Sequence, residues 1–451
     1  MSVFCGIDWA EQHHDVALVD SNGTLIAKAR ITDDAAGYQQ LLALLAEHGD
    51  TESEPIPVAI ETSRGLLVAI LRTGKRQVFA INPLAASRYR DRHGVSRKKS
   101  DLGDALVLAN ILRTDMHAHR PLPADSELAQ SIAVLARAQQ DAVWHRQQAA
   151  NQLRSLLREF YPTALNAFIT GRKGGLAHPE ARAILAIAPT PTIAAKLTKP
   201  QIRAALKRGG RQRYTEAETK RLQEAFRAEH AHQAPLVEEA MGKQMLVLLQ
   251  QLDAAAQGAD SLAEAVESSF REHPDAQLIT SFPGLGCLLG ARILAEIGDD
   301  RDRFADARAL KAYAGSAPVT RASGKKRYVG RRFVKNNRLT HAGYLWSFAA
   351  ITVSPGANAH YRRRRDRGDW HAAAQRNLFN RQCHEVNATA TKSSPSGFCG
   401  QEAFGGEFVG RVRGLFEEPF PGPAAQLDAE AVVVGESECG GKLARVPGAM
   451  R

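Results

Sequence analysis

The stretch SVFCGIDWAEQHHDVALVDSNGTLIAKARIT, residues 2–32, decides the fold of the first third of the chain. Its short apolar runs, broken by polar and turn-forming residues, predict two or three β-strands, with SNG as the hairpin turn between HDVALVD and TLIAKARIT. Outward from it, AGYQQLLALLAEHG predicts an amphipathic helix that ends at Gly49, and PIPVAIET predicts a short buried strand. Strand and helix signals alternate over the first 118 residues, so we expect a mixed α/β domain over residues 1–120, with an antiparallel hairpin first and βα units after it.

The next segment has the pattern of two long helices. Residues 126–160 and 234–270 carry apolar side chains at helical spacing, with a less regular insertion between them. We expect a helical connector over residues 121–275, either a dimerising coiled coil or a helical hairpin within one chain. Residues 278–299, LITSFPGLGCLLGARILAEIGD, predict a helix-hairpin-helix in which outward backbone N–H groups hold a DNA phosphate, or alternatively a glycine-rich turn between two core helices.

Charge and composition divide the C-terminal part of the chain. The net charge is +11, and residues 321–382 alone hold 15 basic and 2 acidic residues, which is typical of a surface that binds nucleic acid. We assign residues 276–382 to a mainly helical C-terminal domain. Residues 383–451 hold 6 basic against 9 acidic residues and no apolar periodicity, so we expect an atypical, disordered tail.

The five cysteines form no CxxC pair, and no apolar run approaches the length of about 18 residues that a membrane span needs. The N-terminus also lacks a secretory signal. These features predict a cytoplasmic protein, associated with the nucleoid if it binds DNA, with no membrane partner.

Four acidic residues are candidates for a metal site. Asp101 and Asp104 lie at i and i+3 of a predicted helix, where capping and metal binding are equally good explanations. Asp8 lies within an apolar strand, where a carboxylate is costly without compensation, and Glu61 ends another strand. If the four carboxylates converge at the carboxyl edge of one sheet, they repel one another, and a bound Mg²⁺ would offset that repulsion. Arg97, Lys98 and Lys99 would steer a polyanion toward these four acids. His13 and His14, which follow Asp8 in the sequence, are better explained as ordinary strand residues than as metal ligands.

Ser323 is a candidate nucleophile. It precedes Gly324 and stands among cations that would stabilise the charge on an attacked phosphorus: Arg321, Lys325, Lys326 and Arg327. On spacing alone, an ordinary loop serine that contacts phosphate is the better explanation.

The chain resembles the IS110-family transposases, RNA-guided recombinases of insertion sequences, over residues 3–381. The resemblance rests on several motifs in the same order: GIDWAEQHHDVALVD, AIETSRG, INPLAASRYRDRHGVSRKKSDLGDALVLANILR, SFPGLGCLLGARILAEIGD, RFADARALKAYAGSAPVTRASGKKRYVGRRFVKNNRL and SPGANAHYRRRRDRGDWHAAAQRNLFNR. It implies a RuvC-like domain of the ribonuclease H fold, a coiled-coil connector and a catalytic serine at Ser323. The acidic set of that domain falls on Asp8, Glu61, Asp101 and Asp104.

The resemblance also implies partners and a reaction. The serine would become covalently linked to DNA, and a structured guide RNA would pair with target and element-end DNA. The acidic domain of one subunit would complete the site with the serine domain of another, in a homodimer that assembles to a tetramer. One departure is that relatives continue after RNLFNR with an apolar helix, whereas this chain changes composition, so we expect that helix to be missing. Two alternatives stay open: a junction nuclease without serine chemistry, and a catalytically inactive nucleic-acid-binding remnant.

Overall fold

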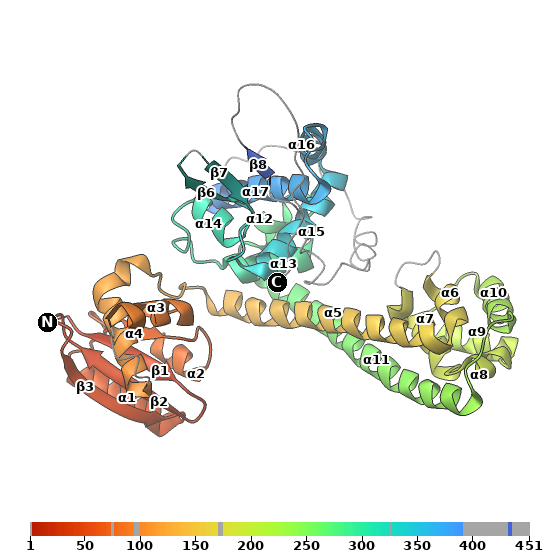
Figure 1. The fold of residues 1–451 in the computed structure, drawn as a ribbon, viewed down its shortest axis with the longest axis horizontal. Helices are drawn as coiled ribbons and strands as arrows, with labels where there is room; N and C mark the ends of the chain where they lie inside the picture. The colour runs from red at the N-terminus through yellow and green to blue at the C-terminus, as the bar shows by residue number, and fades with distance from the viewer. Residues whose placement is uncertain are drawn as a thin grey trace. The chain divides into compact units, whose positions relative to one another are not determined.

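The computed structural model describes residues 2–73, 76–93, 100–169, 175–324, 326–390 and 432–434. The chain divides into two compact units, Met1–Ala124 and Asp125–Arg451 (Figure 1). Within the described residues, no helix combines the length and apolar character that crossing a membrane requires.

The first unit is built on a five-stranded mixed sheet. Its strands are β1 (Phe4–Trp9), β2 (His13–Val19), β3 (Leu25–Thr32), β4 (Val58–Ile60) and β5 (Val78–Ala80). The order across the sheet is β3-β2-β1-β4-β5. The first three strands pair antiparallel, whereas β4 and β5 are parallel to β1. The predicted mixed α/β domain is therefore confirmed, and this topology fits a RuvC-like domain.

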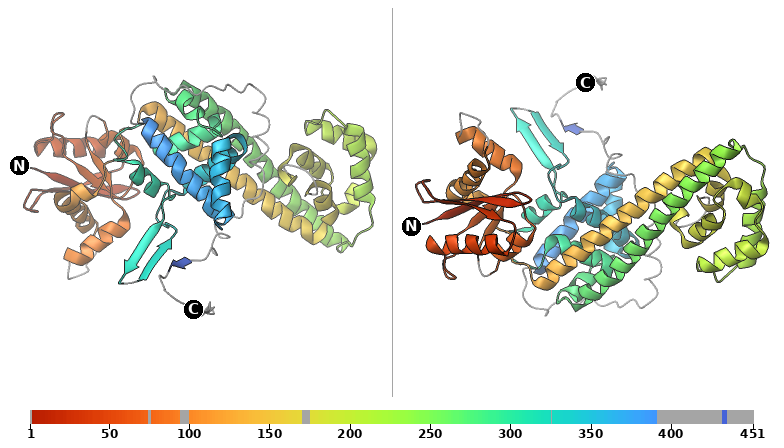
Figure 2. Two further views of the ribbon diagram at one scale, coloured as in Figure 1. Left: turned by 90° about the horizontal axis from the view of Figure 1, so that it is seen from above. Right: turned by 90° about the horizontal axis from the view of Figure 1, so that it is seen from below.

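Helices cover both faces of this sheet, as the views of Figure 2 show. The helices of this unit are α1 (Ala35–Glu47), α2 (Leu66–Leu71), α3 (Pro83–His93), α4 (Asp101–Asp115) and the 3-10 turn η1 (Met116–Ala118). Buried residues of β1 such as Ile7 join one core with Leu41 of α1 and Leu67 of α2. A second core on the opposite face joins Ala59 of β4 to Leu108 of α4. Alternate strand residues thus serve two separate cores, as expected for a sheet buried on both sides.

Helix α4 lies unusually close to the sheet because the strand residues beneath it are small. A Cβ atom added to Gly6 would lie 2.1 Å from the carbonyl oxygen of Ala105. Ala17 and Ala59 are the cross-strand partners of Gly6 and are fully buried beside it. This small-residue row, Gly6, Ala17 and Ala59, allows α4 to approach the backbone of the sheet and fixes the height of the helix above it.

The second unit begins with two long helices that pack antiparallel within the chain. Helices α5 (Glu127–Phe160) and α11 (Pro235–Glu272) meet through Ile132 and Phe270 at one end and through Leu156 and Met245 at the other. The insertion between them folds into small helices at the far end of the pair (Figure 1). These are α6 (Pro162–Ile169), η2 (Gly175–Ala177), α7 (Pro179–Ile187), α8 (Pro191–Ala195), α9 (Lys199–Arg208) and α10 (Thr215–Arg227). The pair is a hairpin within one chain, and its use in dimerisation stays a prediction.

The rest of the second unit is mainly helical. Its elements are α12 (Ala276–Thr280), α13 (Cys287–Ile297), α14 (Ala307–Tyr313), β6 (Val319–Ser323), β7 (Lys326–Gly330), α15 (Asn337–Val353), α16 (Pro355–Asp366), α17 (His371–Ala390) and β8 (Val432–Val434). Leu289 of α13, Trp346 of α15 and Phe379 of α17 meet in its core. Outside this core, β6 and β7 form a hairpin on which β8 pairs with β7.

The predicted helix-hairpin-helix region is a short helix, α12, followed by a tight turn and α13. Gly284 in the turn has φ +86°, and a Cβ atom there would lie 2.7 Å from the backbone nitrogen of Ala350 in α15. The indole Nε1 of Trp346 donates to the carbonyl of Pro283 at 2.9 Å. Close packing against α15 therefore explains Gly284, and a contact of this turn with DNA stays a prediction.

The predicted start of the disordered tail, at residue 383, is wrong because helix α17 extends beyond it. It continues past residue 382 to Ala390, so residues 383–390 are helical and not part of a disordered tail. Ser347 donates to the side chain of Gln382 at 2.7 Å, and Cys383 is only 3% exposed. The helix persists because these side chains still face the core after the change in composition. The remainder of the predicted tail, apart from β8, lies outside the described residues.

Candidate functional site

Two strand residues of the first unit place carboxylates side by side on the face that α4 covers. Asp8 of β1 pairs in register with Asp15 of β2, and Asp15 pairs with Arg30 of β3. Directly opposed residues share a face, so the three side chains form one row across the sheet. Arg30 donates to both carboxylate oxygens of Asp15, from Nε at 3.2 Å and from Nη2 at 2.8 Å.

The first turn of α4 adds two more acids above this row. Ser100 is the N-cap, because its hydroxyl accepts from the backbone nitrogen of Gly103 at 3.2 Å. Capping therefore does not use the predicted Asp101, which is exposed and accepts from Arg30 Nη2 at 3.2 Å. Asp104 is 7% exposed and forms an ion pair with Arg90 of α3 at 2.5 Å. Each acid of the pair on α4 thus has an arginine partner from a different element.

Asp8 is at the electrostatic centre of the cluster. Its pKa is raised from 3.8 to about 6, first by burial and then by neighbouring negative charges. In decreasing order of effect, these charges are Asp104, Glu61, Asp101 and Asp15. Glu61 directly follows β4, whose last residue Ile60 pairs with Ile7 of β1. The structure therefore brings three of the sequence-predicted acids, Glu61, Asp101 and Asp104, within electrostatic range of the fourth, Asp8, and it adds Asp15 to them.

A second grouping of metal-ligating atoms overlaps this cluster. One ligand atom each from His13, Asp15 and Asp101 lies within 4.8 Å of the others. Sequence reasoning treated His13 as an ordinary strand residue and did not single out Asp15. The signal that identifies both residues is the two-residue period of β2, which places His13, Asp15 and Ala17 on one face of the sheet.

The donor set suits a hard divalent cation. Asp8, Glu61, Asp101, Asp104 and Asp15 offer carboxylate oxygens, which are the ligands that Mg²⁺ prefers. The raised pKa of Asp8 records a negative field that a cation would relieve. Arg30 and Arg90 already neutralise part of this field, so they compete with a metal for the same oxygens.

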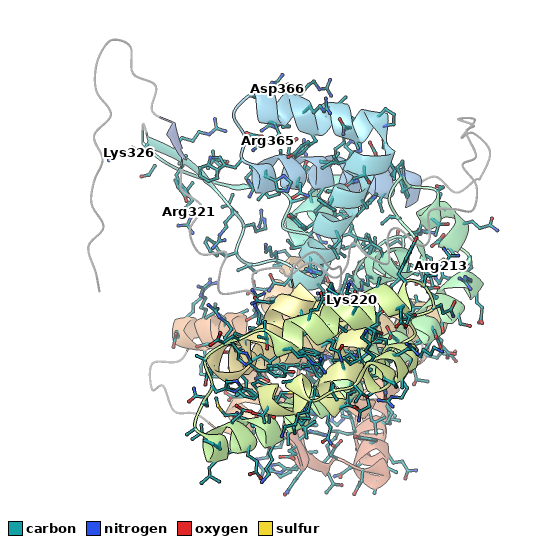
Figure 3. All side chains as sticks on the ribbon, turned by 90° about the vertical axis from the view of Figure 1, so that its right-hand side faces the viewer. Arg213, Lys220, Arg321, Lys326, Arg365 and Asp366 are labelled. Carbon is teal, nitrogen blue, oxygen red and sulfur yellow. The ribbon has the colours of Figure 1, made fainter. Side chains whose placement is uncertain are left out.

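The candidate serine lies in the second unit, in an exposed position at the tip of the β6–β7 hairpin. Ser323 is the last residue of β6 and pairs with Lys326, the first residue of β7, across Gly324 with φ +55°. Arg321 is on the same face as Ser323, two residues earlier, and pairs with Tyr328. Figure 3 labels Arg321 and Lys326 on this hairpin.

Two further observations complete the placement of the predicted basic residues. Arg327 is exposed on the opposite face of the hairpin, where it pairs with Ala322. Arg97, Lys98, Lys99 and Lys325 were also predicted to bind nucleic acid, and they lie outside the described residues.

Two family models match separate parts of the chain. A family model described as "Transposase", for the DEDD transposases of IS110, matches residues 5–162, and a second, described as "Transposase IS116/IS110/IS902 family", matches residues 276–362. The chain is also 73% identical over 381 residues to the "Mini-circle putative transposase for IS117" of Streptomyces coelicolor, covering 84% of this chain and 92% of that protein. The chain belongs to the IS110 family of transposases.

More distant relatives match the transposase over similar lengths. The "Insertion element IS900 uncharacterized 42 kDa protein" of Mycobacterium paratuberculosis is 28% identical over 393 residues, covering 82% of this chain and 91% of that protein. The corresponding protein of IS110 from Streptomyces coelicolor is 27% identical over 398 residues, with 83% and 90% covered. Membership of the transposase family makes the protein an enzyme of DNA transposition, with DNA as its partner.

Proposed function

We propose that this transposase cleaves and exchanges DNA strands through a covalent link between DNA and Ser323, in a reaction that requires Mg²⁺. The observation that carries the proposal is the gathering of carboxylates around Asp8 in a chain whose family moves DNA. The exposed serine hydroxyl, with Arg321 and Lys326 beside it, supplies the second half of the chemistry.

Four acids of the first unit would hold the metal: Asp8, Glu61, Asp101 and Asp104. When bound, Mg²⁺ supplies charge that stabilises the oxygens of a phosphodiester under attack. The carboxylate of Asp8 would respond strongly to the metal, because burial and the neighbouring negative charges raise its pKa to about 6. Arg30 of β3 and Arg90 of α3 hold Asp101 and Asp104 in ion pairs that a metal would have to displace.

The serine step conserves the number of phosphate ester bonds. The Oγ of Ser323 attacks the phosphorus and loses its proton to solvent or a nearby base, while the bond from phosphorus to one deoxyribose oxygen breaks and that oxygen takes up a proton. The new phosphoserine ester keeps the energy of the broken bond, so a second deoxyribose hydroxyl can displace the serine and join a different strand. Arg321 and Lys326 would stabilise the negative charge on the phosphorane.

The partners in this proposal are element-end DNA, target DNA and a structured guide RNA. Base pairing with the RNA would select the sequences, and the basic side chains would bind phosphates without reading sequence. The assembly would be a homodimer that forms a tetramer, in which the acidic cluster of one subunit serves Ser323 of another.

Trapping of the covalent intermediate tests the proposal. Purified protein, element DNA, guide RNA and Mg²⁺ are combined, and denaturing gels detect protein linked to labelled DNA. We expect an adduct with the wild type, none with Ser323→Ala, and little with Asp8→Asn or in EDTA. An adduct that persists in Ser323→Ala would overturn the role of the serine.

Two other outcomes would replace the proposal with its alternatives. Free DNA ends without an adduct, abolished by Asp8→Asn but not by Ser323→Ala, would indicate a metal-dependent junction nuclease. Salt-sensitive binding with no cleavage in any metal would indicate an inactive nucleic-acid-binding protein.

A further inference from the structure

Three basic side chains gather where the β6–β7 hairpin joins the helical core of the second unit. Arg331 and Lys335 are in the segment between β7 and α15, and Arg376 is in the second turn of α17. Ser323 is at the other end of the hairpin. The three cations therefore belong to neither of the candidate sites described above.

Lys335 is held in place through both its side chain and its backbone. A Cβ atom added to Gly315, whose φ is +71°, would lie 2.2 Å from the Cδ of Lys335 and 3.0 Å from its Cβ, so the lysine stem packs on the end of α14. The next residue, Asn336, donates from Nδ2 to Glu296 at 2.6 Å and from its backbone nitrogen to the carbonyl of Tyr313 at 2.8 Å. The position of the lysine is thus fixed before any ligand binds.

Helix α17 brings Arg376 to the same end of α14. The Nδ2 of Asn380 donates to the Oγ of Ser316 at 3.3 Å, and Ser316 directly follows Gly315. Arg376 is one turn before Asn380 on the same face of α17. The face of α17 that carries Arg376 therefore lies toward the end of α14 on which Lys335 packs, and the two helices are in contact (Figure 1).

The electrostatic effects among the three cations show that each is near the other two. Burial, then the charges of Arg331 and Arg376, lower the pKa of Lys335. Partial burial also lowers the pKa of Arg376, while Asp369 acts in the opposite direction and Arg331 in the same direction. The guanidinium of Arg331 is itself held against the exposed ring of Phe333, 4.6 Å from the ring centroid. Three positive charges thus repel one another within a small part of the surface.

The acids nearest to this cluster already have partners. Asp369 is ion-paired with an arginine of α16 at 2.5 Å, and Glu296 with an arginine of α5 at 2.8 Å. Among the described residues, neither Lys335 nor Arg376 forms an ion pair with a carboxylate. Neighbouring cations without a counter-charge oppose folding and attract an anion.

We propose that Arg331, Lys335 and Arg376 together bind a backbone phosphate of a nucleic-acid strand that lies beside the β6–β7 hairpin. Arg331 and Lys335 are half-buried and Arg376 is exposed, so a phosphate can reach all three. DNA is the ligand expected for the family, whereas an RNA ligand rests on the proposed function. Phosphate is common to both, so the site would position a strand without reading its sequence.

Binding of labelled nucleic acid to the full chain in EDTA tests the site without any catalysis. The probes are a DNA duplex, a single-stranded DNA and a single-stranded RNA of the same sequence, each titrated at several salt concentrations. Lys335→Met removes the charge and keeps a stem that packs on Gly315, and Arg376→Met removes the second charge. For each variant we expect the slope of log affinity against log salt to become shallower by about 0.9 on the duplex or about 0.7 on a single strand.

The matched control is Arg381→Met, which removes an arginine five residues later on α17, about 140° around the helix from Arg376. Arg381 is exposed and ion-paired with Glu385 at 3.2 Å. This variant should leave the slope unchanged. A changed slope with the DNA probes alone assigns the site to DNA, one with the RNA probe alone assigns it to RNA, and one with every probe assigns it to both. Equal changes in Arg376→Met and Arg381→Met would overturn the proposal.

The double variant Lys335→Met with Arg376→Met tests whether the cations share one phosphate. If they do, its loss of affinity should differ from the product of the two single losses by at least about twofold. Lys335→Met combined with Arg381→Met should give losses that multiply. Losses that also multiply for Lys335→Met with Arg376→Met would show two independent contacts and would overturn the single site.

Thermal unfolding of the free protein supplies a readout that separates binding from a structural role. Because Lys335→Met and Arg376→Met each relieve repulsion, neither should lower the unfolding midpoint. A lowered midpoint together with an unchanged salt slope would show that the cations serve the fold alone. Failure to trap a DNA adduct at Ser323 would leave these binding results standing, so the site and the proposed function can fail separately.

Discussion

The two candidate halves of the active site are built in opposite ways. The acids are on a sheet buried on both faces and on a helix that contacts the sheet backbone at Gly6, so their positions are fixed by packing. Ser323 is at the tip of an exposed hairpin that contributes little to the core. The contrast teaches that the proposed metal ligands are preorganised, whereas the proposed nucleophile would depend on bound nucleic acid or another subunit for its final position.

The largest expected effect is the loss of strand exchange when either the acidic half or the serine half of the site is inactivated. Asp8→Asn and Ser323→Ala should each lower strand exchange by on the order of 10⁴-fold, as expected when one member of a catalytic unit is removed. If one subunit's acids serve another's serine, a mixture of the two inactive variants should regain measurable exchange. Gel assays of the mixture against each variant alone measure this, and a mixture as inactive as its components would contradict a shared site.

Paired glycine substitutions test the difference in packing. Gly6→Ala should lower the free energy of unfolding by about 3 kcal/mol, because its methyl group would overlap the backbone of α4. Gly324→Ala at the hairpin tip meets open space and only a strained φ of +55°, so its cost should be about 1 kcal/mol. Urea denaturation followed by circular dichroism measures both. Equal costs would mean that the acidic unit is no more tightly packed than the hairpin.

The difference in the pH dependence of stability between Asp8→Asn and wild type should report the acidic half. Because folding raises the pKa of Asp8 from 3.8 to about 6, the folded state binds its proton more tightly than the unfolded chain does. This contribution is present below pH about 4 and is lost as the pH rises through about 6. Without metal, wild type should therefore lose stability relative to Asp8→Asn over this range, while Ser323→Ala tracks wild type. Parallel curves for Asp8→Asn and wild type would contradict the clustered acids.

The smallest effect concerns the arginine that competes with the metal. Arg30→Met should tighten Mn²⁺ binding a few-fold, because it frees Asp15 and Asp101 from a cation that is partly exposed and screened. Lys28→Met is the control, since Lys28 is exposed two residues earlier on the same strand and face. Calorimetric titration distinguishes the two variants. Equal tightening by both would indicate a general charge effect and no specific competition.

Local sequence patterns predicted much of the first unit. The SNG turn predicted the hairpin of β2 and β3, and the apolar runs predicted two or three strands, of which the structure has three. A carboxylate within the strand at Asp8 pointed to the acidic cluster. Asp101 and Asp104 were readable because they are three residues apart at the start of a helix. These features depend on contacts between residues close in sequence or on the cost of burying a charge. Each of these causes produces a pattern that can be recognised in the sequence.

Structural features that depend on strand register, or on packing between residues far apart in the chain, could not be predicted from the sequence. Asp15 joins the cluster because β1 and β2 pair Asp8 with Asp15, and the register of that pairing is set by the turn between the strands. The continuation of α17 past residue 382 depends on Gln382 and Cys383 facing a core formed by other helices.

The small-residue row beneath α4 has a consequence for ion selectivity. Mg²⁺ binds oxygen at about 2.0–2.1 Å, whereas Ca²⁺ takes about 2.3–2.6 Å and a looser shell. The volume of the side chains under the helix sets its height above the sheet, so a methyl group added at Ala17 or Ala59 would move Asp101 and Asp104 away from Asp8. If these acids hold a divalent cation as proposed, substitutions beneath α4 would alter the preference for a small or a large ion.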